Sequence, residues 1–170
     1  MIDLTQNLSW DEYFLKLAYF ISSKSKDVRT KIGSVIVKDK RILSTGYNGI
    51  PAGCDDKNLE RQSYPTKAFY FAHSEANSIF FAARNGVNIS DSSIYTLATP
   101  CSNCCQAIIQ SGIKSVIIHE EYNRLFENDK EWSISCNHTK QMFLEAGVDL
   151  TSFSGFFGYK VLVHGKEHII

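Results

Sequence analysis

The spacing of apolar residues near the start of the chain predicts a helix. Between positions 10 and 21 the large apolar residues recur at intervals of three and four, which gives the helix one apolar side. That side consists of Trp10, Tyr13, Phe14, Leu17, Ala18 and Ile21. Ser9 and Glu12 match the capping-box pattern, in which each side chain bonds the backbone amide of the other residue. The helix is therefore predicted to begin directly after Ser9, and the polar stretch 22–31 ends it.

The next segments predict a hairpin and then alternating helices and strands. Residues 32–37 and 42–47 are apolar or β-branched and flank four polar residues, a pattern typical of an antiparallel hairpin. Helices are expected at 74–85, 102–110 and 137–146, the first and last stopped by Gly86 and Gly147. Strands are expected at 94–98, 116–119 and 159–163. The series of strand, helix and strand from 94 to 119 predicts a parallel crossover.

Composition limits the class of protein. With 170 residues and 44% hydrophobic content, residues 1–170 are expected to form a single domain with a sizeable core. Eighteen basic and eighteen acidic side chains leave no net charge, so no nucleic-acid partner is expected. Residues 1–8 lack a secretory pattern and no apolar run is long enough to span a membrane, which predicts a cytoplasmic protein. Five cysteines, three of them close together, fit reduced thiols and metal ligation.

Two short motifs carry the candidate chemistry. They are His73-Ser74-Glu75 and, after the next predicted strand, Pro100-Cys101-Ser102-Asn103-Cys104. Zinc prefers tetrahedral nitrogen and sulfur ligation, and a catalytic zinc keeps three protein ligands and leaves its fourth position to water. His73, Cys101 and Cys104 meet that count. This pair of motifs is the signature of zinc-dependent nucleobase deaminases.

The spacing of the motifs suits one shared site. Side chains two apart on a helix face different ways, so His73 and Glu75 can converge only if the helix is just beginning there. Cys101 and Cys104 are three apart and share one face, behind Pro100, which favours a helix entry. Both helices then approach the metal with their N-termini, where thiol pKa values are lowered toward the ligating thiolate.

Glu75 is the candidate catalytic residue. A carboxylate beside the zinc can take a proton from water, give it to ring N3 of a cytosine and then protonate the departing amine. The alternatives are a structural zinc site, or a buried histidine with two core cysteines that never meet. A structural site would normally close with a fourth Cys or His, and no partner stands at zinc-finger spacing.

Beyond the zinc motifs, the chain resembles the deoxycytidylate (dCMP) deaminases of the cytidine deaminase superfamily. The segments that carry the resemblance are Ser25-Lys26-Asp27, residues 33–37, the Gly-Tyr-Asn-Gly-Ile-Pro-Ala-Gly run at 46–53, residues 108–114 and 146–148. The resemblance implies an α/β fold, a three-layer α-β-α sandwich around a five-stranded mixed sheet. It further implies one catalytic Zn²⁺ and the conversion of dCMP to dUMP and ammonia, which supplies the precursor of dTMP. Members of this family are commonly hexamers that dCTP activates and dTTP inhibits, so a hexamer, this regulation and Mg²⁺ bound with the regulatory nucleotide are also expected.

Substrate contacts are expected from several further residues. Asn48 offers a donor and an acceptor to the sugar and base, although an ordinary hairpin exit would look the same. The candidates for the 5′-phosphate are Lys26, Arg29 and Lys31, and Arg29 leads because a guanidinium can bind phosphate oxygens in a bidentate fork. The resemblance adds Tyr122, after the fourth strand, and Ala72 and Pro100, which precede the zinc ligands. Packing is the alternative role for Tyr122, whose Glu120-Glu121-Tyr122 setting departs from the commoner Ser-Asp-Lys-Tyr.

Other hypotheses remain open from sequence alone. The chain could be a polynucleotide or tRNA deaminase, against which its zero net charge argues, or a non-catalytic zinc module, against which Glu75 argues. Five further cysteines and histidines are expected to be core thiols and surface histidines, and the alternative is that they form a second metal site. These residues are Cys54, Cys105, Cys136, His119 and His138.

Overall fold

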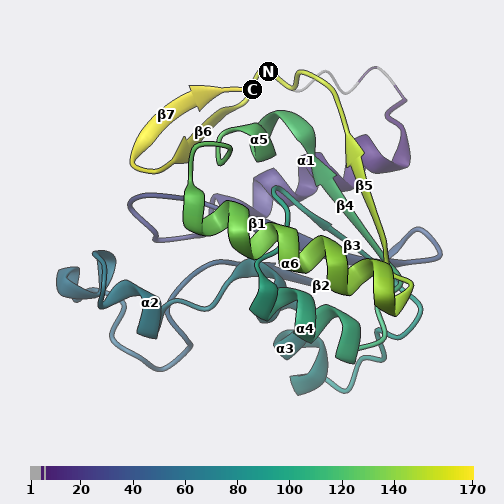
Figure 1. Cartoon of the computed structure of the whole chain (residues 1–170), viewed down its shortest axis with the longest axis horizontal. Coiled ribbons are helices and arrows are strands. Elements are labelled where there is room, and N and C mark those ends of the chain that lie inside the picture. Colours follow the sequence, from purple (N-terminus) through teal and green to yellow (C-terminus); the bar gives the residue numbers. More distant parts are fainter. Residues whose placement is uncertain (1–4, 6) are drawn as a thin grey trace.

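The computed structural model describes residues 5 and 7–170 and is built around a five-stranded mixed sheet (Figure 1). The strand order is β2-β1-β3-β4-β5; β1 is antiparallel to both neighbours, while β3, β4 and β5 are parallel. These strands are β1 (Gly33–Lys38), β2 (Arg41–Tyr47), β3 (Ser93–Thr96), β4 (Ser115–His119) and β5 (Asp149–Phe153). A separate antiparallel hairpin consists of β6 (Lys160–Val163) and β7 (Lys166–Ile169).

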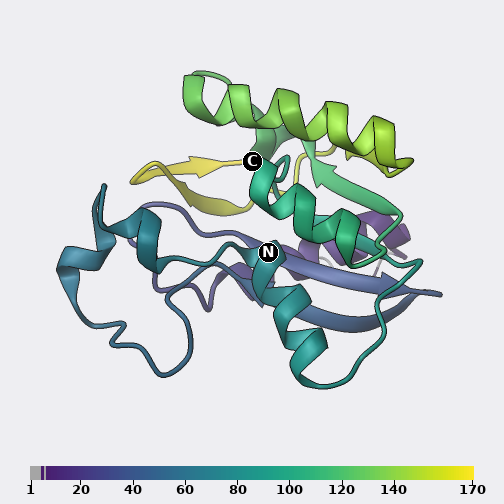
Figure 2. The same cartoon turned by 60° about the horizontal axis from the view of Figure 1, so that its bottom comes forward.

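Helices cover both faces of the sheet, as the three-layer expectation requires. The helical segments of the described chain are α1 (Trp10–Ser22), the 3-10 turn η1 (Leu59–Gln62), α2 (Lys67–Tyr70), α3 (Ser74–Arg84), α4 (Ser102–Gln110), α5 (Glu120–Arg124) and α6 (Lys130–Ala146). Of these, α2 lies apart from the sheet (Figure 1) and packs against η1. Figure 2 shows α3, α4 and α6 on one side of the sheet with α1 behind it. Successive strand residues point to opposite faces, so Val35 and Val37 pack in the core cluster under α1 while Ile36 packs in the cluster under α3 and α4.

Helix α1 begins where the sequence predicts, but the side that it buries is rotated relative to the predicted apolar side. The Ser9 hydroxyl accepts from the Glu12 amide at 3.2 Å, whereas the Glu12 carboxylate pairs with Lys16 at 2.6 Å. The buried residues are Phe14, Leu15, Ala18, Tyr19 and Ser22. Trp10 and Tyr13, expected to be buried, are 49% and 44% exposed. Both rings contact Phe14, at centroid distances of 5.7 and 5.1 Å, from the edge of the core.

Glycine at position 46 allows α3 to lie directly against β2. A Cβ atom at Gly46 would stand 2.3 Å from the Ser74 carbonyl oxygen and 2.5 Å from the Ser78 amide nitrogen. The Ser44 hydroxyl, on the same strand, donates to the Ser78 carbonyl at 2.6 Å. The start of α3 is therefore fixed on the sheet by close backbone contact.

The C-terminal third differs most from the sequence expectations. Helix α6 begins at Lys130 rather than at 137, because the Asp129 side chain caps it by accepting from the Trp132 amide at 2.9 Å. The fifth strand of the sheet is β5, which the pattern did not predict because its residues are mostly exposed. The strand expected at 159–163 does form, but as β6 of the separate hairpin.

Among the described residues, no helix is both long and apolar enough to cross a membrane. Residues 1–4 and 6, on which part of the N-terminal expectation rests, lie outside the described part of the chain.

Candidate metal centre and substrate pocket

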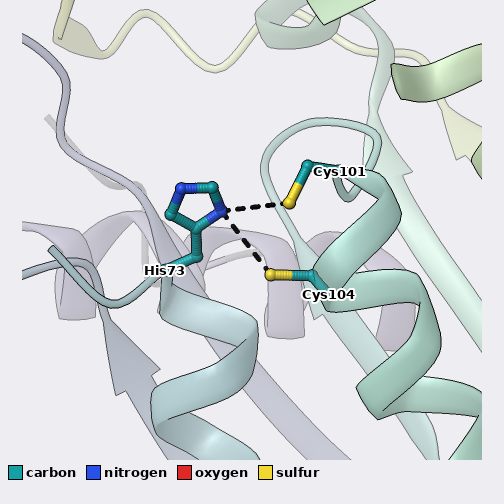
Figure 3. Close-up of side chains that lie close together, drawn as sticks. All are labelled: His73, Cys101 and Cys104. Carbon is teal, nitrogen blue, oxygen red and sulfur yellow. Dashed lines mark hydrogen bonds between the residues drawn. The ribbon is translucent and has the colours of Figure 1, made fainter. Parts of the chain in front are cut away.

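His73, Cys101 and Cys104 converge on one point between α3 and α4 (Figure 3). The His73 Nδ1 atom lies 3.3 Å from the Cys101 sulfur and 3.5 Å from the Cys104 sulfur. All three donor atoms lie within 4.8 Å of one another, and within the described residues they are the one such group found. The sequence prediction that these residues meet is therefore confirmed.

The spacing of these donor atoms fits a tetrahedral zinc ion. With Zn–N near 2.0–2.1 Å and Zn–S near 2.3 Å, two ligands at the tetrahedral angle stand roughly 3.6 Å apart. The measured nitrogen-to-sulfur distances of 3.3 and 3.5 Å are close to that value. One imidazole and two thiols are also the donor chemistry that zinc prefers. The residues present therefore fit a zinc ion with an open fourth position.

The local backbone explains why these side chains are free to ligate. His73 is the N-cap of α3 and Cys101 the N-cap of α4, both with extended backbone and neither with a capping side-chain hydrogen bond. Because His73 precedes the first helical residue, it and Glu75 can face the same site. Cys101 follows the carboxyl end of β3, the edge at which open α/β sheets bind their ligands.

The three ligands already influence one another electrostatically. Hydrogen bonding from Cys104 lowers the pKa of the Cys101 thiol, and His73 adds to that effect. The same contact raises the pKa of Cys104, which donates the shared proton. The hydrogen bond to Cys101 raises the pKa of His73 against the opposing effect of its burial. Metal ligation displaces these protons, because thiolates and a neutral imidazole are the ligating forms.

Glu75 lies beside the ligands without belonging to their group. Its Oε2 atom is 3.9 Å from the Cys104 sulfur and accepts a hydrogen bond from the Ser74 hydroxyl at 2.9 Å. Burial raises the pKa of Glu75, although the positive charge of His73 opposes the shift. A carboxylate that accepts a proton more readily than usual is suited to carry one between water and a substrate.

A cavity of about 530 Å³ opens next to the metal ligands, a volume typical of small-molecule sites. Its inner wall holds His73, Glu75 and Cys101. The other walls come from the segment before β1, the 64–71 segment, the start of α6 and the turn between β6 and β7.

Two of the predicted substrate residues line this cavity. Arg29 is exposed there with no ion-pair partner in the part of the chain that the structure describes. Its backbone is fixed, because its amide donates to Asp27 Oδ1 at 2.8 Å and its carbonyl accepts from the Gly165 amide at 2.7 Å. Asn48 is 7% exposed, and its side chain bonds Ile32, Asp27 and Thr30. Asn48 therefore holds the Arg29 segment in place.

The structure places the other predicted residues away from the cavity wall. Lys26 points to the surface and pairs with Asp56 at 2.6 Å. Tyr122 is fully buried and donates to the Lys31 carbonyl at 2.9 Å, the packing alternative. Ala72 pairs its backbone with Gly49, and the Pro100 carbonyl accepts from Thr139. Lys31 lines a different cavity, between α1 and β6.

Sequence reasoning missed an ion pair in the wall of this cavity. The Lys67 ammonium lies 2.5 Å from the Asp27 carboxylate, and both side chains are almost completely buried. Asp27 also accepts from the Arg29 and Thr30 amides at 2.8 and 3.2 Å. Because the two residues are far apart in sequence, no motif joins them. The Ser25-Lys26-Asp27 run was the one part of the sequence that pointed to this position. In the structure Asp27, not Lys26, lines the cavity.

Comparison with known proteins identifies the family. Residues 8–120 match the model of the cytidine and deoxycytidylate deaminase zinc-binding region. The deoxycytidylate deaminase of Pongo abelii is 37% identical over 153 residues, covering 86% of this chain and 80% of that protein. That of enterobacteria phage T4 is 34% identical over 149 residues, covering 65% and 77%.

This chain belongs to the cytidine and deoxycytidylate deaminase family. The fold agrees with that of the dCMP deaminase from cyanophage S-TIM5, solved with dCMP and dUMP: the TM-score is 0.66 at 23% identity, covering 87% of this chain and 99% of that one. His73, Cys101 and Cys104 are thus the zinc site of a family deaminase. The matched segment ends at residue 120, so the cavity walls from α6 and the hairpin lie beyond it.

Proposed function

We propose that this protein catalyses the hydrolytic deamination of dCMP, with water consumed and dUMP and ammonia released. The observation that carries the proposal is the buried Glu75 carboxylate, which lies 3.9 Å from a zinc-ligand sulfur and lines the same cavity as the ligands. The deoxycytidylate deaminases that resemble this chain along most of its length support dCMP as the substrate. The proposal treats residues 1–170 as a single zinc-dependent domain.

The catalytic role of Glu75 follows from its position. A zinc ion bound by the three ligands supplies an acidic water, whose pKa falls to about 7. Glu75 takes the proton that this water loses and delivers it to ring N3 of the cytosine, which makes C4 more electrophilic. After the water oxygen has bonded to C4, Glu75 takes the second proton of that oxygen and gives it to the amino nitrogen. The C4–N bond then breaks, ammonia leaves and the C4 carbonyl of dUMP forms. The Ser74 hydroxyl donates to Glu75 Oε2 and orients the carboxylate throughout.

Arg29 is the proposed ligand of the 5′-phosphate. Of the Lys and Arg side chains that line the cavity, Arg29 is the one without an ion-pair partner among the described residues, because Lys67 is neutralised by Asp27. Comparing turnover of dCMP, deoxycytidine and CMP by the loss of cytosine absorbance tests the substrate assignment. We expect dCMP to be preferred over both others; equal turnover of deoxycytidine would refute the phosphate contact.

The proposal extends to the assembly of the enzyme and to its regulation by nucleotides. Phe80 and Phe81 on α3 are 61% and 57% exposed, which supports burial of this helix against a second subunit. A hexamer, activation by dCTP with Mg²⁺ and inhibition by dTTP are expected from the family resemblance. Light scattering gives the mass of the assembly, and deamination rates measured with dCTP and with dTTP test the regulation. A monomeric mass would refute the hexamer, and rates that neither nucleotide changes would refute the regulation.

A further inference from the structure

Trp132, near the start of α6, forms part of the cavity wall beside the zinc site. Its ring centroid lies 6.4 Å from that of His73 and 5.3 Å from that of Phe126. Phe126 in turn contacts His164 at 5.0 Å. An aromatic wall therefore runs from the zinc ligand to the turn of the β6–β7 hairpin, with Trp132 at the metal end.

The indole N–H of Trp132 is an unused hydrogen-bond donor. Its Nε1 atom is buried and has no hydrogen-bond partner among the described residues. Thr96 Oγ1 and Tyr159 OH share this property, but neither residue lines the catalytic cavity. An unpaired buried donor costs stability, and an acceptor on a bound ligand would remove that cost.

Hydrogen bonds fix the backbone of the helix that carries Trp132 relative to the zinc ligands. Its own amide donates to Asp129 Oδ1 at 2.9 Å. One turn further along α6, the Ser135 hydroxyl accepts from the Ser102 amide at 2.8 Å, and Ser102 is the first residue of α4. The Thr139 hydroxyl donates to the Pro100 carbonyl at 2.9 Å. The helix that carries Trp132 is thus attached to the helix entry that carries Cys101.

We propose that Trp132 is a substrate-binding residue whose indole N–H donates to an oxygen on the nucleoside half of the substrate. This rests on the proposed function, since the reacting edge of the base must face Glu75 and the zinc ligands. Trp132 lies at that end, beside His73, whereas Arg29 serves the phosphate. An indole nitrogen only donates, so its partner is a carbonyl or hydroxyl oxygen. Because Nε1 is buried, the ring turns toward the cavity when the substrate binds.

The test compares Trp132→Phe with Trp10→Phe. The first change removes the N–H and keeps an aromatic ring. The second is a matched control, because Trp10 is the other tryptophan of the chain and lies on α1, outside the cavity. For W132F, kcat/KM is expected to fall roughly threefold to tenfold, mainly through KM, as for the loss of one neutral hydrogen bond. The factor should be the same for dCMP and deoxycytidine, and W10F should match the wild type.

Each kinetic outcome decides the proposal. A rise in KM for dCMP alone would place Trp132 at the phosphate and overturn the assignment to the nucleoside half. An unchanged KM would overturn the binding role altogether, and a lower Tm with it would identify the ring as packing only. Zinc content, measured on the same samples, establishes that W132F keeps its metal centre.

Fluorescence provides a second measurement that does not depend on turnover or on the folding of W132F. In W10F, Trp132 is the sole tryptophan, so its emission should change with dCMP and with deoxycytidine but not with inorganic phosphate. Emission that changes with neither dCMP nor deoxycytidine, while the wild type deaminates dCMP, would refute the role of Trp132 alone. A response to dCMP without any deamination would support that role and refute the proposed function instead.

Discussion

Substituting Gly46 by alanine should damage the metal centre from outside it. The new Cβ would stand 2.3 Å from the Ser74 carbonyl oxygen, while ordinary contacts begin at 3.4 Å, so the start of α3 must move by about 1 Å. His73 and Glu75 move with it, whereas Cys101 and Cys104 stay on α4. A 1 Å misplacement of catalytic groups can lower activity by about 100-fold. Overpacking of this kind costs about 1–3 kcal/mol of stability.

Gly49→Ala is the matched control for this experiment. A Cβ at Gly49 meets its first neighbours at 3.9 and 4.0 Å, both in the Tyr47 ring, so the substitution fits without movement. Deamination of dCMP, zinc content and Tm should be measured for both variants. We expect G46A to lose roughly 100-fold in kcat/KM together with part of its zinc, and G49A to resemble the wild type. If G46A kept full activity and zinc, the idea that close contact with β2 fixes the zinc-bearing end of α3 would be wrong.

Two further predictions concern Glu75 and His119. Glu75→Gln should retain zinc and Tm but lose about 10²- to 10⁴-fold in kcat, because only the proton carrier is changed; activity near that of the wild type would exclude Glu75 as that carrier. Burial lowers the pKa of His119 below its ordinary 6.5, although its hydrogen bond to Gly155 opposes the shift. The unfolded chain therefore binds a proton that the folded protein refuses, so stability falls as the pH drops below about 6.5. Urea unfolding from pH 7.5 to 5.5 should show a steeper loss for the wild type than for His119→Gln, and equal slopes would contradict it.

Both ring nitrogens of His119 have partners, and Nε2 also lies 3.1 Å from Glu121 Oε2. The Tyr19 hydroxyl lies 2.7 Å from Nδ1, and the Gly155 carbonyl lies 2.7 Å from Nε2. Because the carbonyl can only accept, Nε2 carries a proton, and in the neutral imidazole Nδ1 then accepts from the tyrosine. The Phe157 ring stacks on the imidazole at 4.4 Å. His119, one of the residues considered for a second metal site, is thus a core hydrogen-bonding residue that joins α1 to the segment after β5.

The zinc site could be predicted from sequence because its chemistry is local. Each ligand lies at or next to a helix start that the sequence marks, and two short motifs supply the ligands and the proton carrier. The sheet core was predictable for the same reason, since β1, β2, β3 and β4 are apolar segments with clear boundaries. What the sequence did not state was the close packing of Gly46 on α3, which depends on contacts between distant segments.

The substrate cavity was less predictable because its walls come from segments far apart in the chain. The buried Lys67–Asp27 pair and the contact between Trp132 and His73 arise only after α2 and α6 are placed. Basic residues near the first strand looked equivalent in sequence. In the structure Arg29 faces the cavity while Lys26 pairs with Asp56 at the surface, since Asp27 turns the chain between them.

Metal titration tests the central claim most directly. The protein should be stripped with a chelator, and zinc should then be added back while dCMP deamination and bound metal are followed together. We predict negligible turnover without metal, recovery in proportion to bound zinc, saturation at one zinc per chain, and no recovery for Cys104→Ala. Full activity of the stripped protein, or equal recovery by the Cys104→Ala variant, would contradict the claim that His73, Cys101 and Cys104 hold the catalytic metal.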